Sequence, residues 1–285
     1  MDNISKVTHA MQLVAASRMR RAQDNAMRGK SYTHKIKEMM VRLSANKNVK
    51  GNAFIEPEYA DNVSGTMLVV FSPERGLAGA LPGNLTRYVL KLIESIEKDG
   101  SVSVITVGKK VRDLLARRGV NIIADFSDMP EQPTTADVRP LLKLVEEGYT
   151  AREFGEVLIV LPQFVNAMTQ IPVTRVLLPL DLDAVLKYDD SLNVEDSGGA
   201  ADFIFEPNIE SIFAELIPGY LETQIYQARL ETVASEYSAR MVAMKNATTN
   251  AKDVRSYLSL EYNKSRQAQI TRELAEISAG RMGKG

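Results

Sequence analysis

Apolar residues recur with a helical period near the start of the chain. They follow one another at alternating steps of three and four residues, at Ile4, Val7, Met11 and Val14. Further along the same face the pattern reaches two cationic residues, Arg18 and Arg21. Before about position 50, Gly29 is the only residue that disfavours a helix. We therefore expect a long N-terminal helix whose contact face is only partly apolar.

A second helix is predicted at the other end, because residues 220–279 contain neither glycine nor proline. A helix of that length would extend roughly 90 Å at about 1.5 Å per residue, which is longer than one compact domain. Its candidate contact positions have a period of 3.5, as in coiled coils. They are Leu230, Ala234, Tyr237, Met241, Met244, Thr248, Ala251, Arg255, Leu258, Tyr262, Ser265 and Gln269.

These positions carry small residues and methionine in place of a broad Leu and Ile stripe. Small side chains let two helix backbones approach closely, and methionine adapts to irregular gaps. The N-terminal segment is the only other long helical candidate. We expect the first and last helices to pair antiparallel, with Pro207 preceding the start of the last one.

The middle of the chain, about 64–182, has the shorter period of β-structure. Short β-branched runs bounded by turn residues predict strands at 66–72, 102–108, 120–126 and 156–162. Helical stretches alternate with them at 85–98, 109–118 and 135–149. This alternation predicts an open, mostly parallel sheet covered by helices. A further strand at 171–180 is expected near an edge or an end of the sheet because of its two flanking prolines.

The predicted fold class is therefore α/β, with a Rossmann-like α/β domain inserted between the two helices of a long antiparallel coiled coil. We expect an N-terminal shaft helix in residues 1–60, the inserted domain in 61–205 and the C-terminal shaft helix in 206–285. The polar, acidic stretch 188–202 is interpreted as a linker at the end of the inserted domain.

The loop after the first strand, residues 73–84, lies where a doubly wound domain binds nucleotides. Its glycines, Gly76, Gly79 and Gly83, do not form a G-x-G-x-x-G pattern, and the chain contains no P-loop G-K-[ST]. A tight turn that needs the backbone freedom of glycine is the favoured interpretation, and nucleotide binding is the alternative.

The amino-acid composition excludes several kinds of functional site. The 285 residues include no cysteine, which excludes disulfides, thiolate metal sites and cysteine nucleophiles. His9 and His34 are the only histidines and lie far apart, so we expect ordinary helix-surface residues and no metal site. No run of 18 apolar residues and no apolar signal core are present, which favours a protein that neither spans a membrane nor is exported.

The net charge of −1 conceals a strongly basic first segment. Eleven cations between Lys6 and Lys50 face only Asp2, Asp24 and Glu38. A solvated helix face and a surface that meets an acidic partner or a phosphate backbone are both consistent with this distribution.

Several stretches carry a resemblance to a known family, the γ subunits of rotary ATP synthases. The segment 4–23, ISKVTHAMQLVAASRMRRAQ, resembles the family's opening helix, and VASEYSARMVAMKNATTNA, 233–251, its final helix. YNKSRQAQITRELAEISAG, 262–280, is similar to the terminal signature, although Arg281 stands where alanine is usual. Three further stretches occur in the family's order: RGLAGALPGN, FEP and LETQIYQARLETVASE. The resemblance therefore spans essentially the whole chain.

The resemblance implies a central rotor shaft that couples proton flow through a membrane ring to ATP synthesis or hydrolysis in a ring of α and β subunits. The implied partners are the α and β subunits, the ε subunit and the c-ring, with no nucleic acid and with membrane contact only through the complex. It further implies a peripheral location on the cytoplasmic face of a bacterial plasma membrane. No cofactor and no catalytic site are expected in this chain.

By family position, the resemblance also implies residues at the contact between the shaft and the surrounding ring. They are Met11, Arg18, Arg240, Arg266, Gln267, Thr271 and Glu273. Each could instead be an ordinary exposed or interhelical residue of a coiled coil. Two other classes of protein compete with the rotor: a nicotinamide-dependent oxidoreductase with a helical arm, and a coiled coil that binds nucleic acid through its basic first helix.

Overall fold

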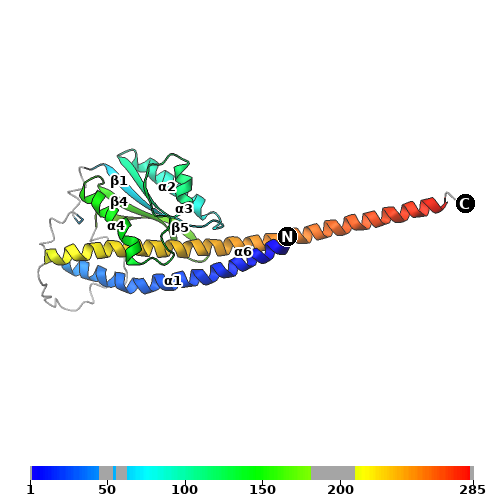
Figure 1. Ribbon diagram of the computed structural model, residues 1–285, viewed down its shortest axis with the longest axis horizontal. Coiled ribbons are helices and arrows are strands. Elements are labelled where there is room, and N and C mark those ends of the chain that lie inside the picture. Colours follow the sequence, from blue (N-terminus) through cyan, green and yellow to red (C-terminus); the bar gives the residue numbers. More distant parts are fainter. Residues whose placement is uncertain (1, 45–53, 56–62, 181–208, 283–285) are drawn as a thin grey trace.

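The computed structural model describes residues 2–44, 54–55, 63–180 and 209–282, and shows an α/β domain beside a long pair of helices (Figure 1). The helices are α1 (Asp2–Ser44), α2 (Leu81–Ile96), α3 (Lys109–Ala116), α4 (Thr135–Thr150) and α6 (Ile209–Met282). The strands are β1 (Gly65–Phe71), β2 (Ser101–Val107), β3 (Ile122–Asp125), β4 (Glu156–Phe164) and β5 (Gln170–Leu178).

The five strands form one sheet in the order β3-β2-β1-β4-β5. All neighbouring pairs are parallel except β4 and β5, which are antiparallel and place β5 at an edge. The predicted mostly parallel sheet and the edge position of the proline-bearing strand are thus confirmed. The order reverses between β1 and β4, and this reversal is where open α/β sheets bind their ligands.

Each face of the sheet has its own apolar core. On one face α2 and α3 pack against alternate residues such as Leu68 and Val70. On the other face Met67, Val69 and their neighbours pack against α4, the first part of α6 and the end of α1. The domain is therefore joined to the shaft through a shared core, since α6 is both a covering helix and a shaft helix.

Helices α1 and α6 run antiparallel. Near one end of the pair, the Thr248 hydroxyl donates to Thr8 Oγ1 at 2.8 Å. Near the other end, Gly29 lies against the side chain of Gln227, since a Cβ added to Gly29 would lie 2.0 Å from Gln227 Nε2. Between these points a small core joins Ala15 and Ala22 to residues of α6.

The face of α1 that contacts α6 differs from the prediction. Ile4, Val7 and Val14 are more than half exposed and Met11 is 38% exposed, whereas Ala15 and Ala22 are buried. Small residues form the interface because the two backbones lie close together, and the larger apolar residues are left on the neighbouring face. The regular spacing indicated a helix correctly but indicated the wrong contact face.

Helix α6 also starts earlier than the stretch free of glycine and proline. It runs through Pro218 and Gly219, because Ile217 and Leu221 on either side are fully buried in the domain core and anchor the helix. Similarly, α2 begins at Leu81, four residues before the predicted start, with Pro82 in its first turn, where proline is tolerated.

The predicted coiled coil ends before the end of α6. The positions up to Ala251 are buried or half-buried, and Ala234, Tyr237, Met241 and Thr248 among them contact α1. Arg255 forms an ion pair with Asp2 at 2.8 Å. Beyond this point, Leu258, Tyr262 and almost every described side chain are exposed. We call residues 256–282 the unpaired segment, and Figure 1 shows it projecting past the described end of α1 as a single helix. The predicted seam through Leu258, Tyr262, Ser265 and Gln269 therefore has no partner helix among the described residues.

Several predictions concern residues outside the described ones. They are the boundaries near residues 60 and 205, Pro207 and the acidic stretch 188–202.

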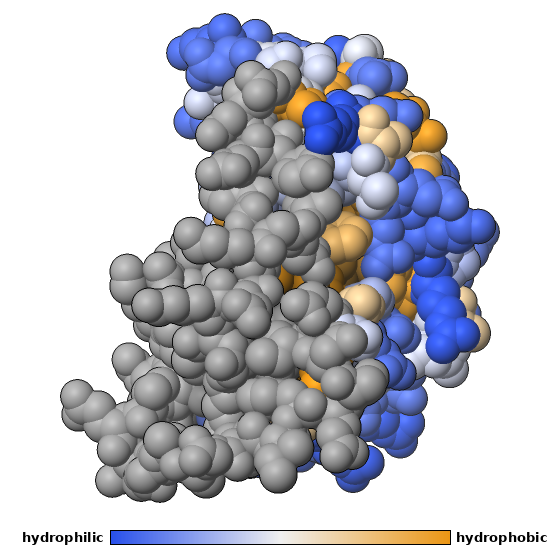
Figure 2. Space-filling view, turned by 90° about the vertical axis from the view of Figure 1, so that its left-hand side faces the viewer, coloured by the Kyte–Doolittle hydropathy of each residue, from blue (hydrophilic) through white to orange (hydrophobic). Residues whose placement is uncertain are grey.

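Seen from the end where α1 finishes and α6 begins, the described surface is mainly hydrophilic with small hydrophobic patches (Figure 2). In the part of the chain that the structure describes, no helix is both long and apolar enough to cross a membrane.

Candidate functional site: the shaft–domain junction

Helix α6 crosses the carboxyl ends of the strands where the sheet order reverses. The Ser235 hydroxyl donates to the carbonyl of Pro162 in β4 at 2.7 Å, and the Ser238 hydroxyl donates to the carbonyl of Ala167 after β4 at 2.7 Å. The loop after β1 contacts the same turns of α6. We call this region the junction; it comprises Arg18, Glu74–Leu77, Glu131, Arg229, Glu236, Tyr237 and Arg240.

Glu236 and Arg240 hold the β1–α2 loop on the shaft. The N–H groups of Glu74 and Arg75 donate to the Glu236 carboxylate at 2.9 and 3.3 Å. Arg240 lies one turn further along α6 and donates to Glu236 Oε1 at 2.6 Å and to the Gly76 carbonyl at 3.1 Å. Glu236 is 5% exposed and Arg240 is 8% exposed. With little water in reach, their charges are compensated mainly by each other and by the loop.

A second cluster joins α1 to the junction. Arg18 donates to the Tyr237 hydroxyl at 2.8 Å and to Glu131 at 3.2 Å, and the Tyr237 hydroxyl itself donates to Glu131. The hydrogen bond to Tyr237 and the negative charge of Glu131 raise the pKa of Arg18 further above its usual value. Guanidinium groups also lie over the Tyr237 ring, that of Arg240 at 5.2 Å and that of Arg18 at 5.6 Å from its centroid.

Arg229 is the most deeply buried charge of the junction, with 1% of the residue exposed. It donates to the carbonyls of Met129 at 2.6 Å and Pro130 at 3.1 Å, beyond the end of β3. Burial lowers its pKa, and the nearby carboxylates of Glu236, Glu74 and Glu131 oppose that effect. The α6 helix is thus tied to the loops after β1, β3 and β4.

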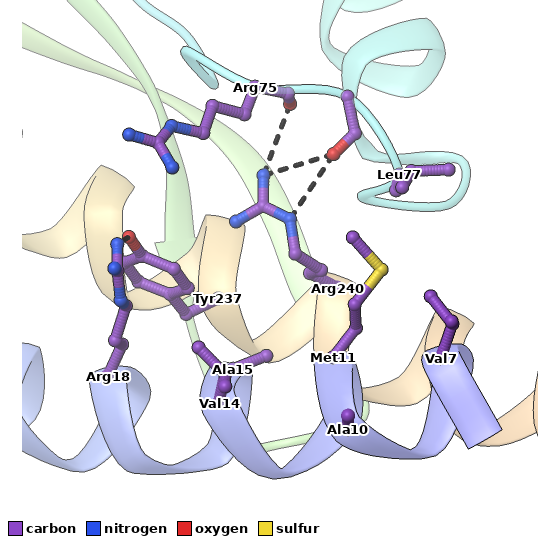
Figure 3. A pocket seen from close by; sticks show the side chains of 11 residues that line it. Val7, Ala10, Met11, Val14, Ala15, Arg18, Arg75, Leu77, Tyr237 and Arg240 are labelled. Carbon is purple, nitrogen blue, oxygen red and sulfur yellow. Dashed lines mark hydrogen bonds between the residues drawn. The ribbon is translucent and has the colours of Figure 1, made fainter.

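A groove with a volume of about 620 Å³ lies beside the junction, between α1, α6 and the β1–α2 loop. Figure 3 shows Val7 and Met11 of α1 pointing toward the loop that carries Leu77, with the Arg240 guanidinium bonded to the loop backbone. Val14 also lines the groove. The exposed apolar face of α1 is therefore one wall of a groove.

The predicted site residues fall into two groups. Met11, Arg18 and Arg240 meet at the groove and junction. The other four lie in the unpaired segment, where Arg266 is roughly 40 Å from Arg240 along the helix at about 1.5 Å per residue. They are Arg266, Gln267, Thr271 and Glu273, and all are exposed. Their contact with a surrounding ring stays a prediction.

Sequence reasoning missed Arg229, Glu236 and Glu131. The spacing of Glu236 and Arg240 by four residues on one helix face was a usable signal for an ion pair. Nothing in the local pattern indicated that this pair would be buried against the loop after β1. The loop prediction was partly correct, since Gly79 adopts a positive φ of 59°, but Leu81–Asn84 already belong to α2.

The fold and the junction define a class of protein: an α/β domain fixed to a long shaft that is formed by the first and last helices. The family profile described as ATP synthase matches residues 1–282. The ATP synthase gamma chain of Roseiflexus sp. (strain RS-1) is 37% identical over 280 residues, covering 98% of this chain and 92% of the relative. The chain therefore belongs to the ATP synthase gamma chain family.

Other comparisons agree with this assignment. The ATP synthase gamma chain of Coxiella burnetii (strain RSA 493 / Nine Mile phase I) is 36% identical over 280 residues, covering 98% of this chain and 93% of the relative. A chain in the structure of the Tetrahymena thermophila mitochondrial ATP synthase central stalk and c-ring has the same fold, with a TM-score of 0.60 and 21% identity. That match covers 85% of this chain and 99% of the other.

Proposed function

We propose that this chain is the central-stalk rotor subunit of an ATP synthase. It couples proton flow through a membrane ring mechanically to ATP synthesis or hydrolysis in a hexamer of α and β subunits, and has no catalytic site of its own. Its partners are the α and β subunits, the ε subunit and the c-ring, on the cytoplasmic face of a bacterial plasma membrane.

The observation that carries this proposal is membership of the ATP synthase gamma chain family along residues 1–282, together with the long helix pair that holds the α/β domain. Tyr262, Ile270 and Leu274 of α6 are each about half exposed or more. These exposed apolar side chains are suited to contacts inside a larger assembly, where they are covered. The family membership identifies that assembly as an ATP synthase.

The junction supports a mechanical role for the α/β domain. In a dinucleotide-binding domain, the N–H groups of the loop after β1 receive a phosphate. Here the N–H groups of Glu74 and Arg75 are bonded to Glu236 of the shaft. This arrangement favours a structural use of the loop over the oxidoreductase alternative.

We further propose that the predicted contact residues meet the α and β subunits weakly. Arg18 and Met11 border a groove, whereas Arg266 and Gln267 are exposed on a single helix. An exposed ion pair contributes only about 0–1 kcal/mol, so contacts of this kind can form and break as the shaft turns. Deep apolar contacts would instead hold the rotor at one angle.

The test is to express the complete ATP synthase with and without this chain. We expect the chain to co-purify with the α and β subunits, and we expect ATP-driven proton pumping in membrane vesicles only when it is present. Reintroducing the chain should restore pumping. Full coupling of hydrolysis to pumping in a preparation that lacks it would contradict the proposal, and micromolar dinucleotide binding by calorimetry would revive the enzyme alternative.

A further inference from the structure

The Glu236 carboxylate lies among the donors that a bound anion would need. It accepts from the N–H groups of Glu74 and Arg75 and from the Arg240 guanidinium, at 2.9, 3.3 and 2.6 Å. Glu236 is 5% exposed, so water does not compete strongly for these donors. Two backbone N–H groups and a guanidinium are a typical set of partners for a carboxylate or phosphate.

The position of this set in the fold strengthens the comparison. The loop follows β1 at the point where the strand order reverses, next to β4. In doubly wound domains, ligands bind at this point outside the carboxyl ends of the strands. In this chain, α6 passes through the same place and contributes its own carboxylate.

We propose that the β1–α2 loop, together with Arg240, is an anion receptor occupied in cis by Glu236, and that the occupied receptor fixes this loop on the shaft. The N–H groups of the loop bond to Glu236, while the carbonyls of Arg75 and Gly76 bond to Arg240. The loop is therefore held on both sides at two successive turns of α6, which restricts its movement relative to the helix.

Other contacts keep the domain attached when Glu236 is removed. Arg229 holds the segment after β3, and Ser235 holds β4. The shared apolar core also includes Leu221 and Ile225 of α6. A variant that lacks the Glu236 carboxylate is thus expected to fold, with the change confined to the loop.

The test is hydrogen exchange of the full chain with Glu236→Ala. Losing a charge-assisted acceptor should speed exchange of the Glu74 and Arg75 amides by about tenfold to a hundredfold, while the β1 amides stay protected. Acetate matches the two carbons and two oxygens removed from Glu236. We expect acetate, but not chloride at equal ionic strength, to slow exchange at both amides in the variant and to leave the wild type unchanged.

Two variants make the result specific. Glu236→Gln keeps an acceptor oxygen but loses the charge, so it should exchange at an intermediate rate and gain nothing from acetate. Glu261→Ala removes a carboxylate from the unpaired segment and should leave both amides as in the wild type. Equal exchange in the wild type and Glu236→Ala would overturn the receptor, as would a response of the variant to chloride equal to its response to acetate.

The mechanical consequence rests on the proposed rotor function and is measured separately in the assembled complex. Glu236→Ala should lower the number of protons pumped per ATP hydrolysed relative to the wild type, whereas Glu261→Ala should not. If acetate protects the amides but coupling in Glu236→Ala matches the wild type, the receptor stands and its role in coupling is overturned. If the chain does not assemble with α and β subunits at all, the rotor proposal fails while the exchange result is unaffected.

Discussion

At the scale of single residues, the junction is built from charges that look like surface residues in the sequence. Glu236 and Arg240 occur in a stretch rich in polar side chains, and Arg229 lies between alanine and leucine. Their burial depends on contacts with loops more than 90 positions away, at Glu74 and Met129. Local spacing cannot predict such contacts, because they depend on how the sheet is placed against α6.

Burial in the junction disfavours the charged form of the Glu74 carboxyl. Burial raises the pKa of its carboxyl above the ordinary 4.5, and the charges of Arg229 and Lys109 only partly oppose that effect. Lys109 Nζ is 3.5 Å away, which is long for an ion pair. A raised pKa means that the folded chain holds the proton more tightly than the unfolded chain. The contribution of Glu74 to stability is therefore greatest below pH 4.5, the ordinary pKa of the carboxyl. It decreases as the pH rises through the raised pKa of the folded chain.

We predict that Glu74→Gln, which is neutral at every pH, stabilises the chain at neutral pH. The gain should be less than about 1 kcal/mol, because water still screens the partly exposed carboxylate. The difference from the wild type should disappear toward about pH 4, where Glu74 is protonated. Thermal unfolding between about pH 4 and about pH 8 measures this, with Glu94→Gln on the exposed face of α2 as the matched control. A variant less stable than the wild type at neutral pH would show that the pairs with Lys109 and Arg229 outweigh burial.

At the scale of elements, the sequence predicted the sheet better than the shaft. β1 and β4 are each continuous apolar runs, because a central parallel strand is buried on both faces. The helical period of α1 was also clear. Its contact face was predicted wrongly because hydrophobicity alone favours Ile4 and Val7, whereas close approach of two helices favours Ala15 and Ala22.

The unpaired segment leads to a prediction about local stability. In the isolated chain, amides in residues 256–282 should exchange at least about a hundredfold faster than those near Ala234, where α6 packs on α1. Hydrogen exchange with mass spectrometry resolves the two regions. Assembly with α and β subunits should protect the segment. Equal protection of both regions in the free chain would show that the segment is stable on its own and needs no covering partner.

At the scale of the whole molecule, two distant regions carry the predicted contacts. Met11, Arg18 and Arg240 lie beside the α/β domain, whereas the other four residues lie far along the unpaired segment. Arg240 is largely used within the chain, so its replacement would disturb the junction as well as any partner contact. A test of partner contact alone must therefore use the unpaired segment, where side chains are exposed and the domain is remote.

We predict that replacing Arg266 and Gln267 together by alanine weakens coupling or assembly without unfolding the α/β domain. Both residues are exposed and α6 stays helical with alanine, so the thermal transition of the isolated chain should not change. With each contact contributing about 0–1 kcal/mol, ATP-driven proton pumping should fall about two- to tenfold. The double change Lys143→Ala and Glu147→Ala removes an exposed ion pair on α4 and is the matched control, with pumping expected as in the wild type. Unchanged pumping in the Arg266 and Gln267 variant would remove both residues from the proposed contact, and would shift the search for ring contacts to Thr271 and Glu273.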